Sequence, residues 1–422
     1  MDAAAPPDAV LVGLHREEHT RLLALLVRRF GDLDLAEDAA QEAMEAALRT
    51  WPRDGVPASP LAWLTRTAQN RALDRVRSDA AAARRLARLR IEHGERAAPP
   101  ADAAMLAAGD LPDDRLAMLM GSCHPALAPA DRIALMLRFV GGLTTAEVAE
   151  ALLIPVPTLQ ARITRAKARI RRAGIPLRVP EDPAERAGRL PLVLTAISLV
   201  FTEGYAASSG DSPLRAELTG EAIRLARILH RLEPGSAEAT GLLALLLLTE
   251  ARAPARLADG LPVPLEEQDR SRWDRDLLAE GIGLAERAAA APGAGRWTIQ
   301  AAIAAVHGEA ADFAQTDWAQ IVALYDLLLH HDSGPVVRMN RAVAVGRRDG
   351  MAAGLVLLDG LGREPELARH HPYHLARAIT LEELGRRADA AEAYRAALAL
   401  VGNAGERELI RRRLGGVEDE LE

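Results

Sequence analysis

A strongly cationic stretch between Val156 and Arg172 has the side chains with the clearest binding chemistry. It carries six basic residues and no acidic one, although the whole chain has a formal net charge of -7. The six are Arg162, Arg165, Lys167, Arg169, Arg171 and Arg172, and Lys167 is the only lysine of the chain. Such groups bind phosphates, and Gln and Arg side chains pair with adenine and guanine edges. The stretch predicts contact with nucleic acid; the alternative is a solvated basic helix face.

The residues around this stretch predict a helix-turn-helix. A first helix is expected from Thr145, with apolar Ala146, Val148 and Leu152, followed by the turn Leu-Ile-Pro-Val at residues 153–156. Pro155 cannot continue a helix interior. The second helix has its apolar residues spaced four, three and four apart, which predicts an inward-facing stripe. This stripe consists of Leu159, Ile163, Ala166 and Ile170, and the outward face carries Gln160, Ala161, Thr164, Arg165 and Lys167.

Composition predicts an all-α protein of several domains. Aromatic residues make up only 3% of the 422 residues, and the apolar content is mainly Ala and Leu, which favour helices. The single cysteine, Cys123, excludes an intramolecular disulfide. The N-terminal residues lack the pattern of a signal peptide, and the most apolar run, 240–251, is too short to span a bilayer. We therefore expect a soluble, cytoplasmic protein that does not bind a membrane.

The chain divides into helical regions separated by Pro- and Gly-containing segments. A first unit is expected up to residue 85, with a helix break near Gly31 and a helix start at Ser59-Pro60. Residues 86–112 lose periodicity and predict a linker. A second unit, 113–175, contains the helix-turn-helix and ends near Gly174.

Residues 176–422 predict stacked helical hairpins. The segment 385–400 resembles 346–361 at an offset of 39 residues, and each follows an Ala-rich helix. Further hairpins are expected from 190–204 with 216–232, 241–252 with 272–291, and 296–309 with 317–331. This rhythm resembles tetratricopeptide-type repeats, whose extended surface binds proteins or peptides.

Two stretches together resemble one family. The sequence from Gly31 to Arg77, with "AEDAAQEA", resembles regions 2.1 to 2.4 of the extracytoplasmic-function (ECF) sigma factors of bacterial RNA polymerase. "LAPADRIALMLRFVGGLTTAEVAEALLIPVPTLQARITRAKARIRRAG" resembles their region 4. The remainder resembles a subgroup of these factors with a tetratricopeptide-like C-terminal extension, in blocks such as "FTEGYAASSG" and "EEQDRSRWDRDLLAEG".

The resemblance implies an initiation factor that gives core RNA polymerase promoter recognition and strand opening, without an active site or cofactor of its own. Its domains would be region 2 (1–85), the linker (86–112), region 4 (113–175) and the extension (176–422). Its partners would be promoter DNA, the β′ clamp helices and β flap of the polymerase, and a protein partner of the extension. We expect the extension to modulate activity.

The resemblance also assigns roles to individual residues. Asp38, Gln41 and Glu42 would contact the clamp helices. Contacts with the −10 element and the melted strand are implied for Arg66, Asn70, Arg71, Arg75 and Arg77. Contacts with the −35 element are implied for Thr158, Gln160, Ala161, Arg162, Thr164, Arg165 and Arg169, with an internal salt bridge as the alternative for Arg162.

Three other groups of residues carry weaker signals. Asp269 and Arg272 are spaced to pair on a helix and could either form a surface ion pair or contact the sigma regions or the polymerase. His370, His371 and His374 are interrupted by a proline and are not expected to converge on a metal. Cys123 has no second cysteine beside it and is expected to be buried rather than a metal ligand.

Two other functions remain open on sequence alone. One is a tetratricopeptide-type regulator that binds duplex DNA but never replaces a sigma factor. The other is an interaction adaptor without DNA affinity. An enzyme has the least support, because the sequence contains no phosphate-binding loop, HExxH motif or nucleophile elbow.

Overall fold

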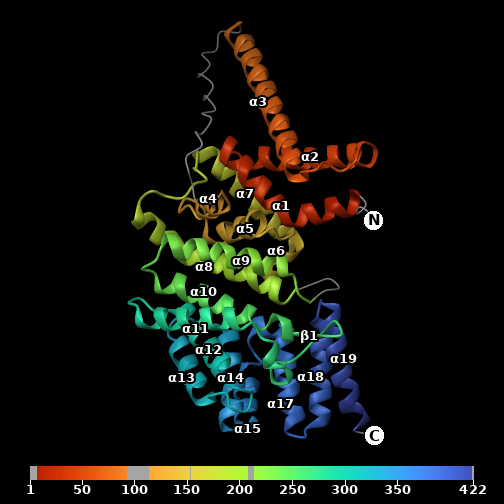
Figure 1. The fold of residues 1–422 in the computed structure, drawn as a ribbon, viewed down its shortest axis with the longest axis vertical. Helices are drawn as coiled ribbons and strands as arrows, with labels where there is room; N and C mark the ends of the chain where they lie inside the picture. The colour runs from red at the N-terminus through yellow and green to blue at the C-terminus, as the bar shows by residue number, and fades with distance from the viewer. Residues whose placement is uncertain (1–6, 93–113, 153, 208–212, 421–422) are drawn as a thin grey trace. The chain divides into compact units, whose positions relative to one another are not determined.

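The protein, seen here as a computed structural model, is described for residues 7–92, 114–152, 154–207 and 213–420 (Figure 1). Within these residues the regular structure is helical apart from one pair of two-residue strands, so the predicted all-α class is confirmed. The chain forms two compact units, Met1–Ala196 and Ile197–Glu422, called here the N-terminal and C-terminal units.

The N-terminal unit begins with three long helices. The break predicted near Gly31 is confirmed: Gly31 has φ +69°, and Asp32 caps the next helix by accepting from the backbone N–H groups of Asp34 and Leu35 at 2.8 and 3.1 Å. The helices of this unit are α1 (Pro7–Phe30), α2 (Leu33–Asp54), α3 (Pro60–Glu92), α4 (Asp114–Ser122), α5 (Pro129–Phe139), α6 (Thr145–Ala151) and α7 (Val156–Ala173), and α8 (Pro183–Tyr205) crosses into the second unit.

Helix α3 is longer than the sequence pattern indicates. It starts at Pro60, as predicted, but continues to Glu92, through the first seven residues of the segment expected to be a linker. Those residues are mostly Leu, Arg and Ala, which favour a helix even where no apolar stripe is evident. The rest of that segment, from residue 93, lies outside the described residues.

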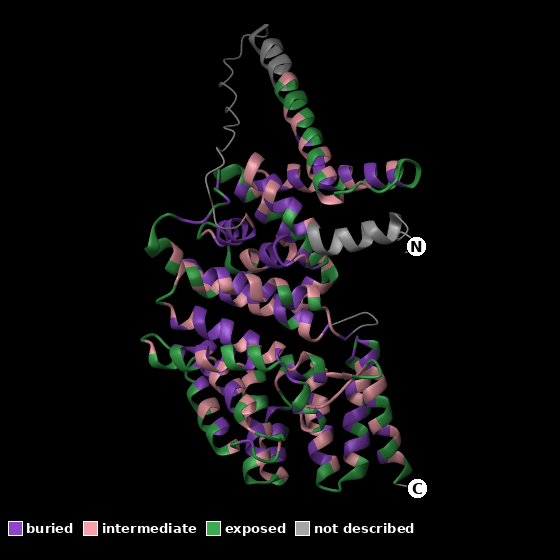
Figure 2. Cartoon of the chain, in the orientation of Figure 1, coloured by how far each residue is buried: buried purple, intermediate pink, exposed green. Residues whose placement is uncertain are grey.

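The C-terminal unit is built from helical hairpins. The predicted pairs α10 with α11, α12 with α13, α14 with α15 and α17 with α18 pack as neighbours, and Figure 2 shows that α10 is buried almost throughout. The bounds of the helices are α9 (Ala216–Leu232), α10 (Ala237–Glu250), α11 (Arg275–Ala290), α12 (Arg296–Glu309), α13 (Trp318–Leu328), α14 (Pro335–Asp349), α15 (Met351–Leu361), α16 (Pro365–Ala368), α17 (His371–Glu383), α18 (Arg387–Leu400) and α19 (Ala404–Asp419).

Short elements fill the connection between α10 and α11. Two strands, β1 (Leu257–Ala258) and β2 (Leu261–Pro262), form an antiparallel hairpin whose turn places Asp259 and Gly260 at positive φ. Three 3-10 turns accompany the hairpin: η1 (Ala253–Ala255), η2 (Leu265–Glu267) and η3 (Arg270–Arg272).

One described helix, α8, is long and apolar enough to cross a membrane by length and composition, with a mean hydropathy of 1.2. Half of its apolar window is buried inside the structure. A core helix of a water-soluble domain has the same properties, so α8 carries no argument for a membrane span.

The hairpins depend on small residues where helices meet. A Cβ atom on Gly241 of α10 would lie 2.6 Å from the backbone nitrogen of Thr298 at the start of α12, closer than atoms can approach. In contrast, a Cβ atom on Gly220 of α9 would meet no atom within 4 Å. Gly241 is therefore required by packing, whereas Gly220 is not.

We predict opposite outcomes for alanine at these two glycines. Gly241→Ala should lower the free energy of unfolding by about 1–3 kcal/mol through overpacking. Gly220→Ala, the matched control, should leave it unchanged or raise it by up to about 1 kcal/mol, because alanine favours a helix. Urea unfolding followed by far-UV circular dichroism checks both; equal effects would contradict the packing at Gly241.

Candidate nucleic-acid interface

Helices α6 and α7 form the predicted helix-turn-helix. Thr144 and Glu147 form a capping box that fixes the start of α6. The turn ends at Pro155, which precedes the first residue of α7, and Gly174 ends α7 with a left-handed φ of +58°. The apolar stripe is buried as predicted and consists of Leu159, Ile163, Ala166 and Ile170.

Burial of this stripe orients the rest of α7 outward. Of the seven residues predicted to read the −35 element, Arg162 is half-buried and the others are exposed: Thr158, Gln160, Ala161, Thr164, Arg165 and Arg169. The Thr164 hydroxyl donates to the backbone carbonyl of Gln160 at 3.0 Å, which orders the exposed turn between them. Arg162 forms no salt bridge within 4 Å with a described residue, so the internal pair considered for it is absent from this part of the chain.

Two further cations of α7, Lys167 and Arg171, are paired with carboxylates of α2. The ammonium group of Lys167 bonds to carboxylates of Asp34 and Glu37 on α2, and the guanidinium group of Arg171 bonds to Asp34. The sequence pattern predicts an outward-facing Lys167 and gives no indication of these partners. They lie more than 100 residues away, and no local pattern connects them.

The residues predicted to read the −10 element lie on two faces of α3. All five are exposed, but Arg71 and Arg75 face α2 whereas Arg66, Asn70 and Arg77 occupy the other arc of the helix. Arg71 lies 3.8 Å from Glu42, and Arg75 lies 3.3 Å from Asp38 and 3.7 Å from Glu42. The structure therefore brings Arg71 and Arg75 onto the two carboxylates predicted to bind the polymerase.

Helix α2 has carboxylates along one broad arc. Asp38 and Glu42 are one turn apart and remain about half exposed, and the neighbouring Gln41 bonds to Glu45 at 3.4 Å. Asp34 and Glu37 continue the arc toward the N-terminus of the helix. One helix thus provides acidic partners both for α3 and for α7.

Asp269 and Arg272, for which the sequence leaves a surface ion pair open, form no salt bridge within 4 Å of each other. Residues 270–272 form a 3-10 turn, not an α-helix, and Asp269 caps it by accepting from the backbone and hydroxyl of Ser271 at 2.9 and 2.6 Å. Both Asp269 and Arg272 are exposed. The Asp269 carboxylate is instead occupied by Ser271, whose hydrogen bonds lower the pKa of Asp269, and Arg272 adds a smaller lowering.

The residues next to Asp269 hold this connection to the rest of the C-terminal unit. Arg270 is buried and donates to the backbone carbonyls of His307 and Ala310, at 2.7 Å each, where α12 ends. Its guanidinium group also lies 4.8 Å from the ring centre of the buried Trp273. The block "EEQDRSRWDRD" is thus largely architectural.

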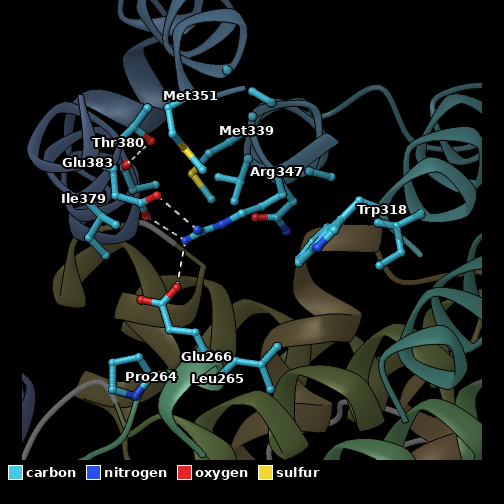
Figure 3. A pocket seen from close by; sticks show the side chains of 18 of the residues that line it. Pro264, Leu265, Glu266, Trp318, Met339, Arg347, Met351, Ile379, Thr380 and Glu383 are labelled. Atoms are coloured by element: carbon cyan, nitrogen blue, oxygen red, sulfur yellow. Dashed lines mark hydrogen bonds and ion pairs between the residues drawn. The ribbon is translucent and has the colours of Figure 1, made fainter. Parts of the chain in front are cut away.

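A cavity of about 400 Å³ lies within the C-terminal unit and is lined by residues of α13, α14, α15 and α17 (Figure 3). Its charged group, Arg347, bonds to Glu266 at 2.8 Å and to Glu383 at 2.9 Å, so its charge is neutralised. The wall is otherwise mainly apolar and includes Trp318, Met339, Met351 and Ile379. Apolar side chains of a partner would fit this cavity better than an ion.

The described residues contain no cluster of three potential metal ligands. His371 pairs with Glu406 at 3.0 Å, whereas His374 bonds to a backbone carbonyl, so the histidines around Pro372 do not converge. Cys123 is buried, as predicted, and burial raises the pKa of its thiol to about 12. That thiol is therefore protonated at neutral pH and unreactive.

Comparison with known proteins supports the two sigma regions. The sigma-70 region 2 family matches residues 14–82, and the sigma-70 region 4 family matches residues 117–170. The ECF RNA polymerase sigma factor SigK of Mycobacterium ulcerans is 34% identical over 146 residues, which are 34% of this chain and 74% of SigK. The chain belongs to the ECF sigma factors of bacterial RNA polymerase.

About two thirds of this sigma factor lie outside the part that aligns with SigK. A family of unknown function (DUF6596) matches residues 189–289. An uncharacterised protein of Rhizobium meliloti is 43% identical over 405 residues, covering 93% of this chain and 92% of that protein, so it shares the extension. SigK of Mycobacterium tuberculosis is 30% identical over 152 residues, which are 35% of this chain and 76% of that SigK. No solved structure is significantly similar to the chain.

We predict that the carboxylates facing α3 are dispensable for folding. Their ion pairs are long and exposed, and such pairs contribute at most about 1 kcal/mol. Asp38→Asn combined with Glu42→Gln should therefore change the free energy of unfolding by less than about 1 kcal/mol, as should the control Glu150→Gln on α6. A loss of several kcal/mol in urea unfolding would show that these pairs are structural.

Proposed function

We propose that this ECF sigma factor recognises the −10 and −35 elements of a promoter, opens the −10 region, and thereby directs core RNA polymerase to start transcription in the cytoplasm. In this proposal the polymerase performs the chemistry, and the sigma factor has no active site of its own. The extension modulates this activity through a protein partner.

We assign the contacts with the −35 element to the outward face of α7. Gln160, Thr164 and Arg165 are exposed on a helix held by its buried stripe, which is the arrangement that a major groove accepts. Thr158, Arg162 and Arg169 flank them and suit phosphates. On α3, Arg66, Asn70 and Arg77 form an exposed arc that suits the bases and phosphates of a melted strand.

We assign the contacts with the polymerase to α2 and region 4. Asp38, Gln41 and Glu42 form an exposed acidic and polar face for the β′ clamp helices, and region 4 contacts the β flap. If the clamp helices bind Asp38 and Glu42, they take these carboxylates from Arg71 and Arg75. Both arginines then become available to DNA, which would couple polymerase binding to −10 recognition.

The direct test is run-off transcription on DNA from upstream of the protein's own gene, with core polymerase and either the full chain or a chain ending at Ala196. A discrete transcript that depends on the added protein is expected. A difference between the two chains gives the sign of the extension's effect, and equal activity would remove the modulating role. Duplex binding without any transcript would favour an ordinary helix-turn-helix regulator.

We predict distinct effects for two arginines of α7. Arg165→Ala should reduce discrimination between the −35 element and a scrambled sequence by roughly 10-fold, because a base contact is lost, while core binding is retained. The control Arg169→Ala removes a proposed phosphate contact and should weaken binding to both sequences equally. Fluorescence anisotropy with holoenzyme checks this. Equal loss of core binding and −35 selectivity for Arg165→Ala would count against its role.

A further inference from the structure

The cavity lined by α13, α14, α15 and α17 has a wall whose chemistry points to one kind of ligand. We propose that it binds a small, uncharged aromatic molecule, recognised by contacts with aromatic rings and by the side-chain amide of Asn340. All residues of the wall belong to the C-terminal unit. Such a ligand gives this unit a chemical input of its own, in addition to the protein partner proposed above.

The cavity has the size of a small-molecule site. Its volume of about 400 Å³ falls toward the lower end of the usual range for such sites, about 300–1,000 Å³, and suits a molecule of two fused rings. Met339 and Met351 line it beside Arg347 (Figure 3). Methionine side chains are flexible, and their sulfur atoms make favourable contacts with aromatic rings.

A cluster of aromatic rings forms another part of the wall. The rings of Phe313 and Trp318 meet edge to face with centres 5.3 Å apart, and His307 meets Trp318 in the same way, also at 5.3 Å. Tyr325 adds a further ring to the wall. Aromatic rings prefer offset or edge-to-face contacts with one another. A flat aromatic ligand would therefore extend a cluster that the fold already contains.

The charged residues of the wall are paired with one another. Arg347 bonds to Glu266 at 2.8 Å and to Glu383 at 2.9 Å, and Glu266 also lies 3.8 Å from Arg413. A charged ligand would have to displace one of these partners and would lose its own hydration on entry. An uncharged ligand avoids both costs.

The two titratable rings of the wall are uncharged at neutral pH. Burial, together with the nearby guanidinium groups of Arg252 and Arg270, lowers the pKa of His307 to about 4. Burial raises the pKa of Tyr325 to about 12, which keeps its hydroxyl protonated. The aromatic part of the wall is therefore complementary to a ligand without charge.

Asn340 supplies a polar group that is open to a ligand. Its side-chain amide forms no hydrogen bond with a described residue, whereas the Thr380 hydroxyl in the same wall donates to the carbonyl of Ala376 at 2.8 Å. An amide contains one acceptor and two donor hydrogens, so it can pair with a carbonyl or another amide. Asn340 thus favours an aromatic ring that carries such a group over a plain hydrocarbon.

The ion pairs of Arg347 connect three elements at the rim of the cavity. Arg347 of α14 lies between Glu266 of η2 and Glu383 of α17, and the three side chains are 20–36% exposed (Figure 3). Pro264 and Leu265, which precede Glu266, also line the cavity. A ligand that packs against Leu265 would tie the connection between α10 and α11 to α14 and α17. Its binding would therefore stabilise the folded C-terminal unit.

The direct probe is prodan, an uncharged naphthalene ketone whose emission moves to shorter wavelength in apolar surroundings. The full chain should bind it with blue-shifted emission. Three competitors share one shape and differ in charge: 2-naphthamide is neutral, 2-naphthoate is an anion and 2-naphthamidine is a cation. We expect 2-naphthamide to displace prodan at a concentration about 10-fold lower than either ion.

The other outcomes of this titration contradict the proposal. Absence of prodan binding, or no displacement by any competitor, would overturn the site. Equal displacement by all three, or a preference for either ion, would overturn the assignment of an uncharged ligand.

Two variants locate the binding. Asn340→Leu keeps a side chain of similar size at an exposed position but removes the amide. It should weaken 2-naphthamide by about 5- to 10-fold and leave the affinity for naphthalene, which has no polar group, unchanged. Equal loss for both compounds, or for neither, would overturn the role of Asn340.

The second variant fills the cavity. Ala376→Phe on α17 places a ring in the space and should abolish prodan binding, whereas the control Ala352→Phe, at an exposed position of α15 outside the wall, should not. Far-UV circular dichroism shows whether both variants fold. Unchanged prodan binding by folded Ala376→Phe would place the probe elsewhere and overturn the site.

Thermal unfolding gives a measurement without a fluorophore. At about 100 times its dissociation constant, 2-naphthamide should raise the Tm of the unaltered chain by about 5 °C. An unchanged Tm would contradict binding to the folded unit. These assays contain neither DNA nor polymerase, so their outcome is independent of the proposed function, and a missing transcript would leave the ligand site intact.

Discussion

In the N-terminal unit, the carboxylates of α2 decide which cations of α3 and α7 are paired. Asp34 and Glu37 bind cations of α7, and Asp38 and Glu42 contact cations of α3. A protein that binds DNA through clustered arginines must keep these charges soluble and apart from one another before DNA arrives. Here a single helix supplies the opposite charge to cations of both α3 and α7.

The contacts on α2 differ in strength, and the difference follows from burial. Lys167 is mostly buried and bonds to two carboxylates at 2.6 Å, whereas Arg71 and Arg75 are about half exposed and lie 3.3–3.8 Å from theirs. Water and salt screen the exposed pairs far more than the buried one. A partner can therefore displace the arginines of α3 at little cost, while release of α7 requires a larger compensating interaction.

The C-terminal unit is held together by different contacts. Its hairpins rely on small residues at helix contacts, such as Gly241 against Thr298, and on buried cations that cap helix ends, such as Arg270 at the end of α12. Its charged cavity residue Arg347 is neutralised by two glutamates. The rest of the wall of this cavity is mainly apolar, in contrast to the ionic contacts of α2.

The sequence by itself determined the helices and which side of α7 is buried, because a period of 3.6 residues depends only on neighbours along the chain. It located the break at Gly31, the stripe from Leu159 to Ile170 and the hairpins at an offset of 39 residues, each a local pattern. It also yielded the exposed positions of six of the seven predicted −35 readers, since these lie away from the stripe; Arg162 is half-buried.

Only the tertiary structure decided which charges meet. Lys167 is separated from Asp34 by 133 residues, and nothing in the spacing of either helix indicates the other. Asp269 shows the same limit at short range: its spacing from Arg272 is compatible with an ion pair, but its carboxylate caps a 3-10 turn and accepts from Ser271 instead. Charge pairing depends on how whole elements pack, whereas periodicity describes one element at a time.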